Sequence, residues 1–154
     1  MLVWVVALTL GCERQAKVIT VQQVEKFLKA VDAASAKKDP QVLLDHMAPD
    51  ALITVKMNGP NGRQILRFNG KDYEARVKAE LAALKDYKYQ RSDTRIEISQ
   101  DQQQARVSMK ILELLTAPNG TYRAETTQST IYVLRDGKLM IQKVDSESTA
   151  SRVK

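Results

Sequence analysis

The chain has 154 residues, of which 44% are hydrophobic and 27% charged, values that fit one globular domain and exclude a disordered or low-complexity protein. Its formal net charge is +6, but the basic residues are dispersed, with no run longer than Lys37-Lys38. Aromatic residues make up only 5% and alternate with basic ones only in the segment 86–91, so we expect no nucleic-acid binding.

The chain opens with an apolar run of 11 residues, and Cys12, the only cysteine, follows it directly. A membrane-spanning helix needs about 20 residues, so this length fits the hydrophobic region of a secretory signal. The segment 8–12, Leu-Thr-Leu-Gly-Cys, resembles a bacterial lipobox. Thr9 and Leu10 stand one step out of the usual lipobox register, and no Lys or Arg precedes the run. The alternatives are an uncleaved or conventional signal, or a segment packed on the domain with a buried cysteine.

The lipobox resemblance implies cleavage before Cys12 and lipid attachment to its sulfur. We interpret residues 1–12 as the signal and lipobox segment and residues 13–20 as a tether. Several acyl chains on one cysteine would hold the protein at a membrane, because each buried CH₂ contributes about 0.8 kcal/mol. Glu13 after the cysteine permits sorting to an outer membrane. We therefore expect a lipid-anchored protein of the bacterial cell envelope that faces the periplasm, with the outer membrane favoured.

The spacing of apolar residues predicts three helices, over residues 21–38, 41–47 and 71–85. Thr20 is a suitable N-cap for the first helix, which must end before Asp39-Pro40 because the residue before proline avoids the α region. Asp39 is then the N-cap of the short second helix.

The remaining segments have the composition of β-strands, over residues 51–57, 64–68, 87–99, 105–116, 121–134 and 139–144. Turn clusters rich in Gly, Asn, Asp and Pro separate the strands of each predicted hairpin. Residues 147–154 show no periodicity and are interpreted as a polar tail.

This order of elements resembles the nuclear transport factor 2-like superfamily, also called SnoaL-like, over residues 21–146. The segment 132–141 with its Asp-Gly turn, and Gly70 at the start of the third helix, carry the resemblance. It implies an α+β fold in which a curved antiparallel or mixed sheet packs on three N-terminal helices as a cone with an internal pocket. It also implies a homodimer formed through the sheets.

Enzymes of this superfamily generally place an acid–base residue in that pocket, which makes polar residues on the inner strand faces the candidates. The alternation of the last three strands places Glu113, Glu125, Thr127 and Lys143 on the expected inner face. Glu113 and Glu125 are the catalytic candidates, whereas Tyr73, Thr127 and Lys143 are the ligand-pocket candidates. The alternative is that bulges in a bent sheet switch the alternation and leave the strand residues in solvent.

His46, the only histidine, lies beside Asp45, but neighbouring helical residues point about 100° apart and do not form a base with its orienting acid. One His and one Cys predict no metal site, and no motif indicates a cofactor. We therefore expect a non-catalytic protein that binds a small apolar ligand or an envelope protein. The alternatives are a SnoaL-like isomerase or hydratase that uses a pocket carboxylate, and a structural subunit of an envelope assembly.

Overall fold

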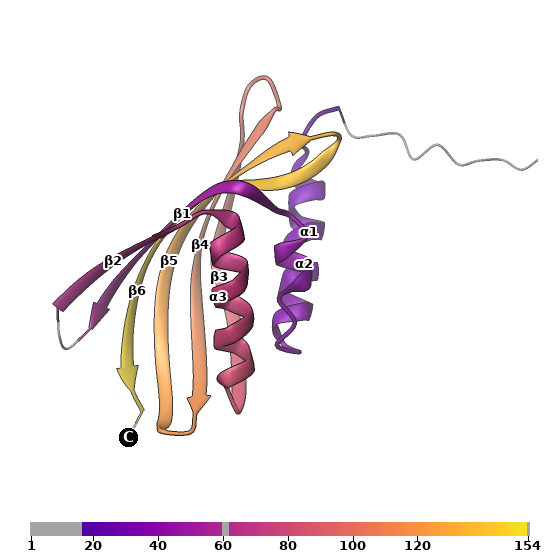
Figure 1. The fold of residues 1–154 in the computed structure, drawn as a ribbon. Helices are drawn as coiled ribbons and strands as arrows, with labels where there is room; N and C mark the ends of the chain where they lie inside the picture. The colour runs from indigo at the N-terminus through magenta and orange to yellow at the C-terminus, as the bar shows by residue number, and fades with distance from the viewer. Residues whose placement is uncertain (1–16, 60–61, 154) are drawn as a thin grey trace, which may run out of the picture.

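The computed structural model describes residues 17–59 and 62–153, so Cys12 and the rest of the predicted signal lie outside the described residues. Within these residues one sheet of six strands curves around helices on its concave side (Figure 1). The strands are β1 (Met47–Gly59), β2 (Gly62–Phe68), β3 (Asp86–Ile98), β4 (Gln104–Ala117), β5 (Gly120–Arg135) and β6 (Lys138–Arg152). They are ordered β2-β1-β6-β5-β4-β3, and all neighbours are antiparallel except the parallel pair β1 and β6. The predicted α+β class with a curved mixed sheet is confirmed.

The helices are α1 (Val21–Ser35), α2 (Gln41–Leu44) and α3 (Gly70–Ala83). Helix α1 begins at the predicted N-cap, where the Thr20 hydroxyl accepts a hydrogen bond from the backbone N of Gln23 at 3.2 Å. Helix α3 begins in the same way after Asn69, because such side chains satisfy N–H groups that a helix start leaves unpaired. The prediction of a helix over 41–47 is wrong in its last turn, because Met47 already belongs to β1.

Strand β6 continues far beyond its predicted end. It pairs with β5 as far as Arg152, so the prediction of a polar tail over 147–154 is wrong. β6 lies between β1 and β5, and its backbone groups are therefore hydrogen-bonded on both edges. Its inner face here carries Ser146, Ser148 and Ala150 in place of large apolar residues, which is why the sequence shows no hydrophobic alternation.

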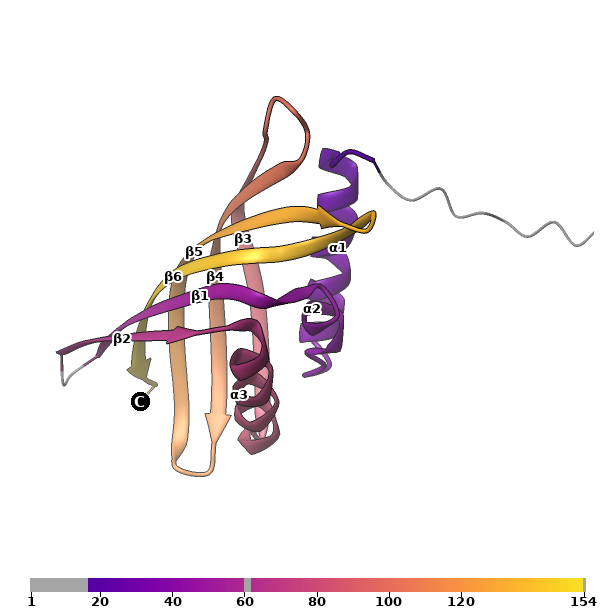
Figure 2. The ribbon, with the colours of Figure 1, turned by 45° about the horizontal axis from the view of Figure 1, so that its top comes forward.

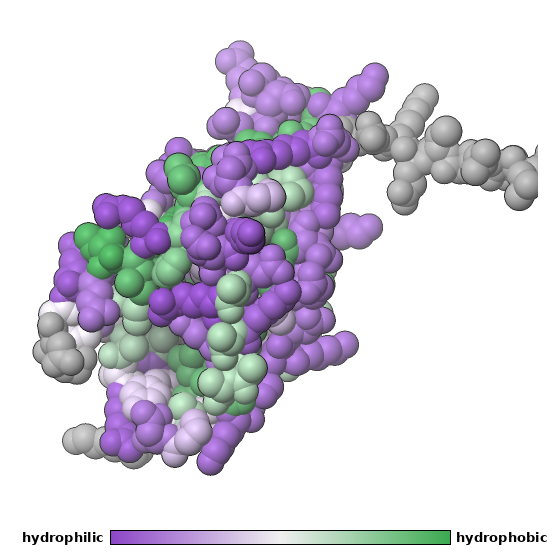
Figure 3. Space-filling view, viewed as in Figure 1, coloured by the Kyte–Doolittle hydropathy of each residue, from purple (hydrophilic) through white to green (hydrophobic). Residues whose placement is uncertain are grey.

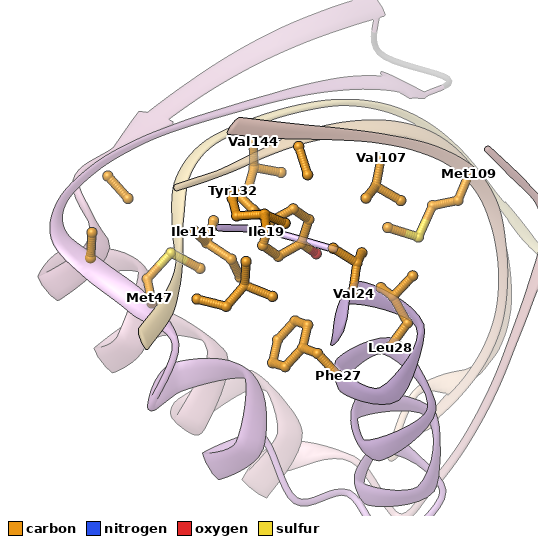
Figure 4. Close-up of a cluster of buried hydrophobic side chains, with 14 of the residues drawn as sticks. Ile19, Val24, Phe27, Leu28, Met47, Val107, Met109, Tyr132, Ile141 and Val144 are labelled. Carbon is orange, nitrogen blue, oxygen red and sulfur yellow. The ribbon is translucent and has the colours of Figure 1, made fainter. Parts of the chain in front are cut away.

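The hydrophobic core fills the part of the cone beneath α1. Figure 4 shows Val24 and Phe27 of α1 directed toward Tyr132 and Ile141 of the sheet. Ile19, which precedes the helix, is 0% exposed, and its N–H donates to the carbonyl O of Gln102 at 2.8 Å. The predicted tether over 13–20 is therefore wrong at its C-terminal end. Burying a side chain of this size contributes about 1.5–3 kcal/mol, so Ile19 is part of the folded domain.

Helix α3 packs much less closely than α1. Its first residue, Gly70, is buried, and a Cβ atom there would lie 2.0 Å from the carbonyl O of Ala48, so only glycine lets the helix begin against β1. At the other end the Lys38 amine donates to the carbonyl O of Leu84 at 3.1 Å. Every other residue of α3 is at least partly exposed. Figures 1 and 2 show the helix in front of β3, with β4 beside it.

Candidate functional site

A cavity of about 520 Å³ lies between α3 and the concave face of the sheet. Its walls come from α3, from the end of α1 and the turn into α2, and from the inner faces of all six strands. Val77 and Leu81 of α3, and Leu84 directly after the helix, face the cavity and are only half-buried. Figure 3 shows hydrophobic residues at the surface beside α3, between it and the hairpin of β1 and β2. The cavity therefore has the size and lining of a site for a small organic molecule.

Every aromatic side chain among the described residues lines this cavity. They are Phe27, Phe68, Tyr73, Tyr87, Tyr89, Tyr122 and Tyr132. They come from five different elements, so only the tertiary fold brings them together. An aromatic ring offers a large apolar surface, and a tyrosine adds a polar tip that can orient a ligand. A chain with so few aromatic residues thus concentrates them at one site.

Glu113 on β4 is the carboxylate that the described strands direct into the cavity. Its Oε1 accepts a hydrogen bond from the Tyr87 hydroxyl at 2.5 Å. Tyr89 lies directly opposite Glu113 in the antiparallel pairing of β3 and β4, and Tyr87 lies two residues away on the same face. No ion pair among the described residues includes Glu113.

Burial raises the pKa of the Glu113 carboxyl, the Tyr87 hydrogen bond lowers it in part, and the negative charge of Glu80 raises it again. Burial also raises the pKa of Tyr73 and that of Tyr89 to about 12 each, and raises the pKa of Tyr87 in the same direction. The charge of Glu113 adds to the shift at each of these tyrosines. Their hydroxyls are therefore protonated at neutral pH and can donate hydrogen bonds, whereas Glu113 can hold or release a proton.

One basic residue lies at the edge of the cavity. Arg76 of α3 forms an ion pair with Glu80 at 2.6 Å, and its guanidinium lies 5.2 Å from the centre of the Phe68 ring. The side chains of Arg76 and Glu80 are 42% and 58% exposed, so this pair is solvated and contributes at most about 1 kcal/mol. Arg76 is thus matched in charge by Glu80.

The structure brings together only two of the residues that the sequence suggested for the site. Glu113 and Tyr73 line the cavity. The other three, Glu125, Thr127 and Lys143, lie on the outer face of the sheet. The Glu125 and Lys143 side chains are 64% and 48% exposed and form ion pairs with neighbours on the same strand. The prediction that these three line the pocket is wrong.

The misplacement has two physical causes. On β5 the apolar residues Ile131 and Val133 lie on the outer face, whereas Tyr132 is the buried residue, so their alternation indicates the wrong side. On β6 a bulge at Gln142 shifts the pairing, because Tyr132 pairs with Ile141 but Ile131 pairs with Lys143. Beyond a bulge the strand turns the opposite set of side chains inward.

Tyr87 and Tyr89 are site residues that were not among the candidates predicted from the sequence. Strict alternation along β3 would put them on the face opposite to Ile96 and Ile98, because the two pairs differ in parity. The pairing of β3 with β4 shifts between Ser92 and Arg95, and this irregularity brings both pairs to the inner face. The hydrogen bond from Tyr87 to Glu113 joins residues 26 apart in the sequence, so no local signal indicates it.

His46 does not take part in this site. Its Nδ1 lies 3.0 Å from the carbonyl O of Val42, and its ring packs on Phe27 at 4.5 Å between centres. Burial lowers its pKa. Among the described residues, no group of three or more His, Cys, Asp or Glu side chains could hold a metal ion. In the same part of the chain, no helix has the length and apolar character needed to cross a membrane.

By sequence, the chain matches no protein-family model and no curated protein. Solved structures resemble it in three dimensions. A protein from Novosphingobium aromaticivorans DSM 12444, named as a candidate scytalone dehydratase, has a TM-score of 0.68 and 12% identity, with 86% of this chain and 87% of that chain covered. The hexachlorocyclohexane dehydrochlorinase LinA-type3 from Novosphingobium barchaimii LL02 has a TM-score of 0.58 and 15% identity, with 84% and 83% covered.

An NTF2-like protein from Rhodospirillum rubrum ATCC 11170, of unknown function in nutrient uptake, has a TM-score of 0.57 and 11% identity. The aligned regions cover 85% of this chain and 98% of that one. The chain therefore has the cone-shaped nuclear transport factor 2-like fold. At identities this low, the structural likeness shows the fold alone, and the function has to be argued from the site.

Proposed function

We propose that this protein binds a small, largely apolar molecule inside the cone. The observation that carries the proposal is the cavity of about 520 Å³ lined by every aromatic residue of the described chain. Protein interiors leave few voids larger than a water molecule, so a space of this size is not ordinary packing. A purely structural subunit would gain stability by filling the cone. An open, aromatic interior favours a ligand site instead.

The proposal is tested with the neutral fluorescent probe N-phenyl-1-naphthylamine and a pair of matched variants. Leu115 lines the cavity, whereas its neighbour Leu114 lies on the opposite face of β4. Leu115→Trp should fill the cavity and abolish probe binding, measured by fluorescence titration, and Leu114→Trp should retain it. Absence of probe binding by the wild-type protein, or an equal loss in both variants, would refute the proposal.

A second candidate function is proton transfer to or from a bound carbon acid, and the Glu113–Tyr87 pair favours it. A carboxylate with a raised pKa can take a proton from a carbon next to a carbonyl. Tyr87 already donates its one hydroxyl proton to Glu113 and holds the carboxylate in place, so a second cavity hydroxyl such as that of Tyr89 would donate to the oxygen that gains charge. The names of two structural neighbours, a dehydratase and a dehydrochlorinase, are compatible with such chemistry.

This candidate is tested by hydrogen exchange of an apolar ketone, 2-tetralone, in D₂O. If Glu113 acts as the base, the wild-type protein accelerates deuterium incorporation at the carbon next to the carbonyl, and Glu113→Gln lowers that rate at least 100-fold. Glu125→Gln, on the outer face, should exchange like wild type. Equal exchange with and without protein would leave ligand binding as the proposed function.

We propose that a lipid anchor at Cys12 holds the protein in the bacterial cell envelope, where the domain faces the periplasm. The described chain begins beside the β3–β4 turn, where the Gln103 amide donates to the carbonyl O of Lys17 at 3.1 Å. Three residues of the cavity lining, Tyr87 of β3, Leu115 of β4 and Tyr122 of β5, lie at the strand ends opposite this turn, so an anchor at the N-terminal side would lie away from that part of the cavity. The intact mass of protein extracted from bacterial membranes tests this proposal. The wild-type mass should show cleavage before Cys12 and an added diacylglycerol, and both should be absent in Cys12→Ala.

A further inference from the structure

The cavity is acidic inside a protein whose formal net charge is +6. Its charged lining residues are Asp39, Arg76, Glu80 and Glu113. Arg76 is paired with Glu80, and Asp39 is exposed where it accepts a hydrogen bond from the backbone N of Gln41 at 2.9 Å. Glu113 is therefore left as the interior charge without a cationic partner among the described residues.

The hydrogen-bonding capacity of Glu113 is only partly used. A carboxylate offers about four acceptor positions on its two oxygens, and Tyr87 occupies one of them. A buried carboxylate without a cation is costly, and an opposite charge nearby removes much of that cost. The site is thus suited to a ligand that brings a positive charge and N–H donors.

The aromatic lining suits the same kind of ligand. Tyr87 and Tyr89 flank Glu113 on β3, and Tyr73 lies across the cavity on α3, where its pKa responds to the charge of Glu113. The faces of aromatic rings attract cations, and this attraction grows where water is excluded. Beyond these rings the lining is aliphatic, with Leu81 and Leu115 among its residues. The part of the cavity around Glu113 would therefore accept the charged group of a ligand, and the aliphatic part would accept its apolar portion.

We propose that the cavity binds an amphiphilic organic cation, an apolar molecule with a protonated amine or quaternary ammonium group that lies beside Glu113 and its neighbouring tyrosines. This inference rests on the proposed ligand-binding function and names the chemical class of the ligand. The amine is bound as a cation and undergoes no reaction.

The binding of such a ligand depends on pH through Glu113. The titratable and charged groups that line the cavity around it are Tyr73, Arg76 and Glu80 of α3, Tyr87 and Tyr89 of β3, Tyr122 and Tyr132 of β5, and Asp39 of the α1–α2 turn. Burial raises the pKa of Tyr73, Tyr87, Tyr89 and Tyr132, so these hydroxyls stay neutral around pH 7, where an alkylamine, with a pKa near that of lysine at about 10.4, stays protonated. Affinity for the cation should therefore rise as Glu113 ionises, at a pH above the ordinary range of a glutamate carboxyl, because burial raises its pKa.

Three probes with the same chain and different head groups test the inference: decylamine, decanol and decanoate, titrated calorimetrically below their micelle concentrations at pH 7. The wild-type protein should bind decylamine at least about tenfold more tightly than decanol, and decanoate most weakly. Glu113→Gln keeps the size of the side chain and its acceptor for Tyr87, and it should remove the preference for the amine. Glu125→Gln removes the same charge from the outer face and should keep that preference.

The outcomes separate the inference from the function on which it rests. If decanol or decanoate binds as tightly as decylamine, or if the preference survives in Glu113→Gln, the cation is refuted while the ligand cavity stands. If none of the three probes binds and N-phenyl-1-naphthylamine also fails to bind, the ligand-binding function itself is refuted. Loss of the preference in Glu125→Gln would assign it to the general surface charge and would also overturn the inference.

Discussion

The two halves of the cone differ in how their interior is used. Beneath α1 the interior is filled: Val24, Ile53 and Ile141 are at most 1% exposed and belong to one continuous core. Beneath α3 the interior is open, and residues such as Leu81 of the helix and Leu115 of the sheet remain half-buried around the cavity. The same curved sheet forms the floor of both halves.

This contrast shows which half stabilises the fold and which half is available for a ligand. Helix α1 is held by its apolar face, whereas α3 is held mainly at its two ends, by the close approach at Gly70 and by Lys38. A helix fixed at its ends can span a cavity without filling it. The filled half supplies the stability that permits polar groups such as Glu113 in the open half.

The largest expected effect is the difference in stability loss when one side chain is truncated to alanine in the filled half and one in the open half. Ile141→Ala removes a fully buried side chain of the filled half and should lower the free energy of unfolding by about 2–5 kcal/mol. Leu81→Ala in the open half removes a half-buried side chain that borders empty space, and the loss should be about 1 kcal/mol. Urea denaturation of both variants measures the difference, and equal losses would mean that the open half is packed as tightly as the core.

The attachment of α3 should be sensitive to one methyl group. Gly70→Ala places a Cβ against the backbone of Ala48 and should cost about 3 kcal/mol, because backbone has to move. Gly59→Ala is the matched control: no atom lies within 4 Å of its added Cβ, and its change in stability should be below about 0.5 kcal/mol. Equal melting temperatures for the two variants would show that α3 does not depend on this contact.

The buried carboxylate should make stability depend on pH. Because the folded protein raises the pKa of Glu113, the cost of its charge is absent below about pH 4, where the carboxyl is neutral in both states. The cost appears as pH rises through its folded pKa. Glu113→Gln should therefore gain stability relative to wild type between pH 4 and pH 7, measured by urea denaturation at both values. The exposed Glu125→Gln should show no such trend, and a gain that shrinks with pH would contradict the shift.

Much of the fold could be predicted from local signals. The cap at Thr20, the periodicity of α1 and the turn residues of the hairpins place most elements to within a few residues, because each depends on interactions between near neighbours in sequence. Strand β6 beyond Val144 could not be predicted in this way. Its pairing depends on β1 and β5, and its small inner residues carry no hydrophobic pattern.

The sequence by itself determined the class of fold, and the parity of Val107, Met109 and Ile111 indicated an inward Glu113. Leu112 and Leu114 make this part of β4 apolar on both faces, so only the unbroken pairing of β4 with β5 settles that position. Only the tertiary structure decided which residues meet Glu113 and which lie outside. The bulge at Gln142 turns Lys143 outward, and the pairing of β3 with β4 brings the Tyr87 hydroxyl to the carboxylate. The cavity also depends on the tertiary structure, because its size follows from how far α3 lies from the sheet. That distance is set by contacts between residues remote in the chain.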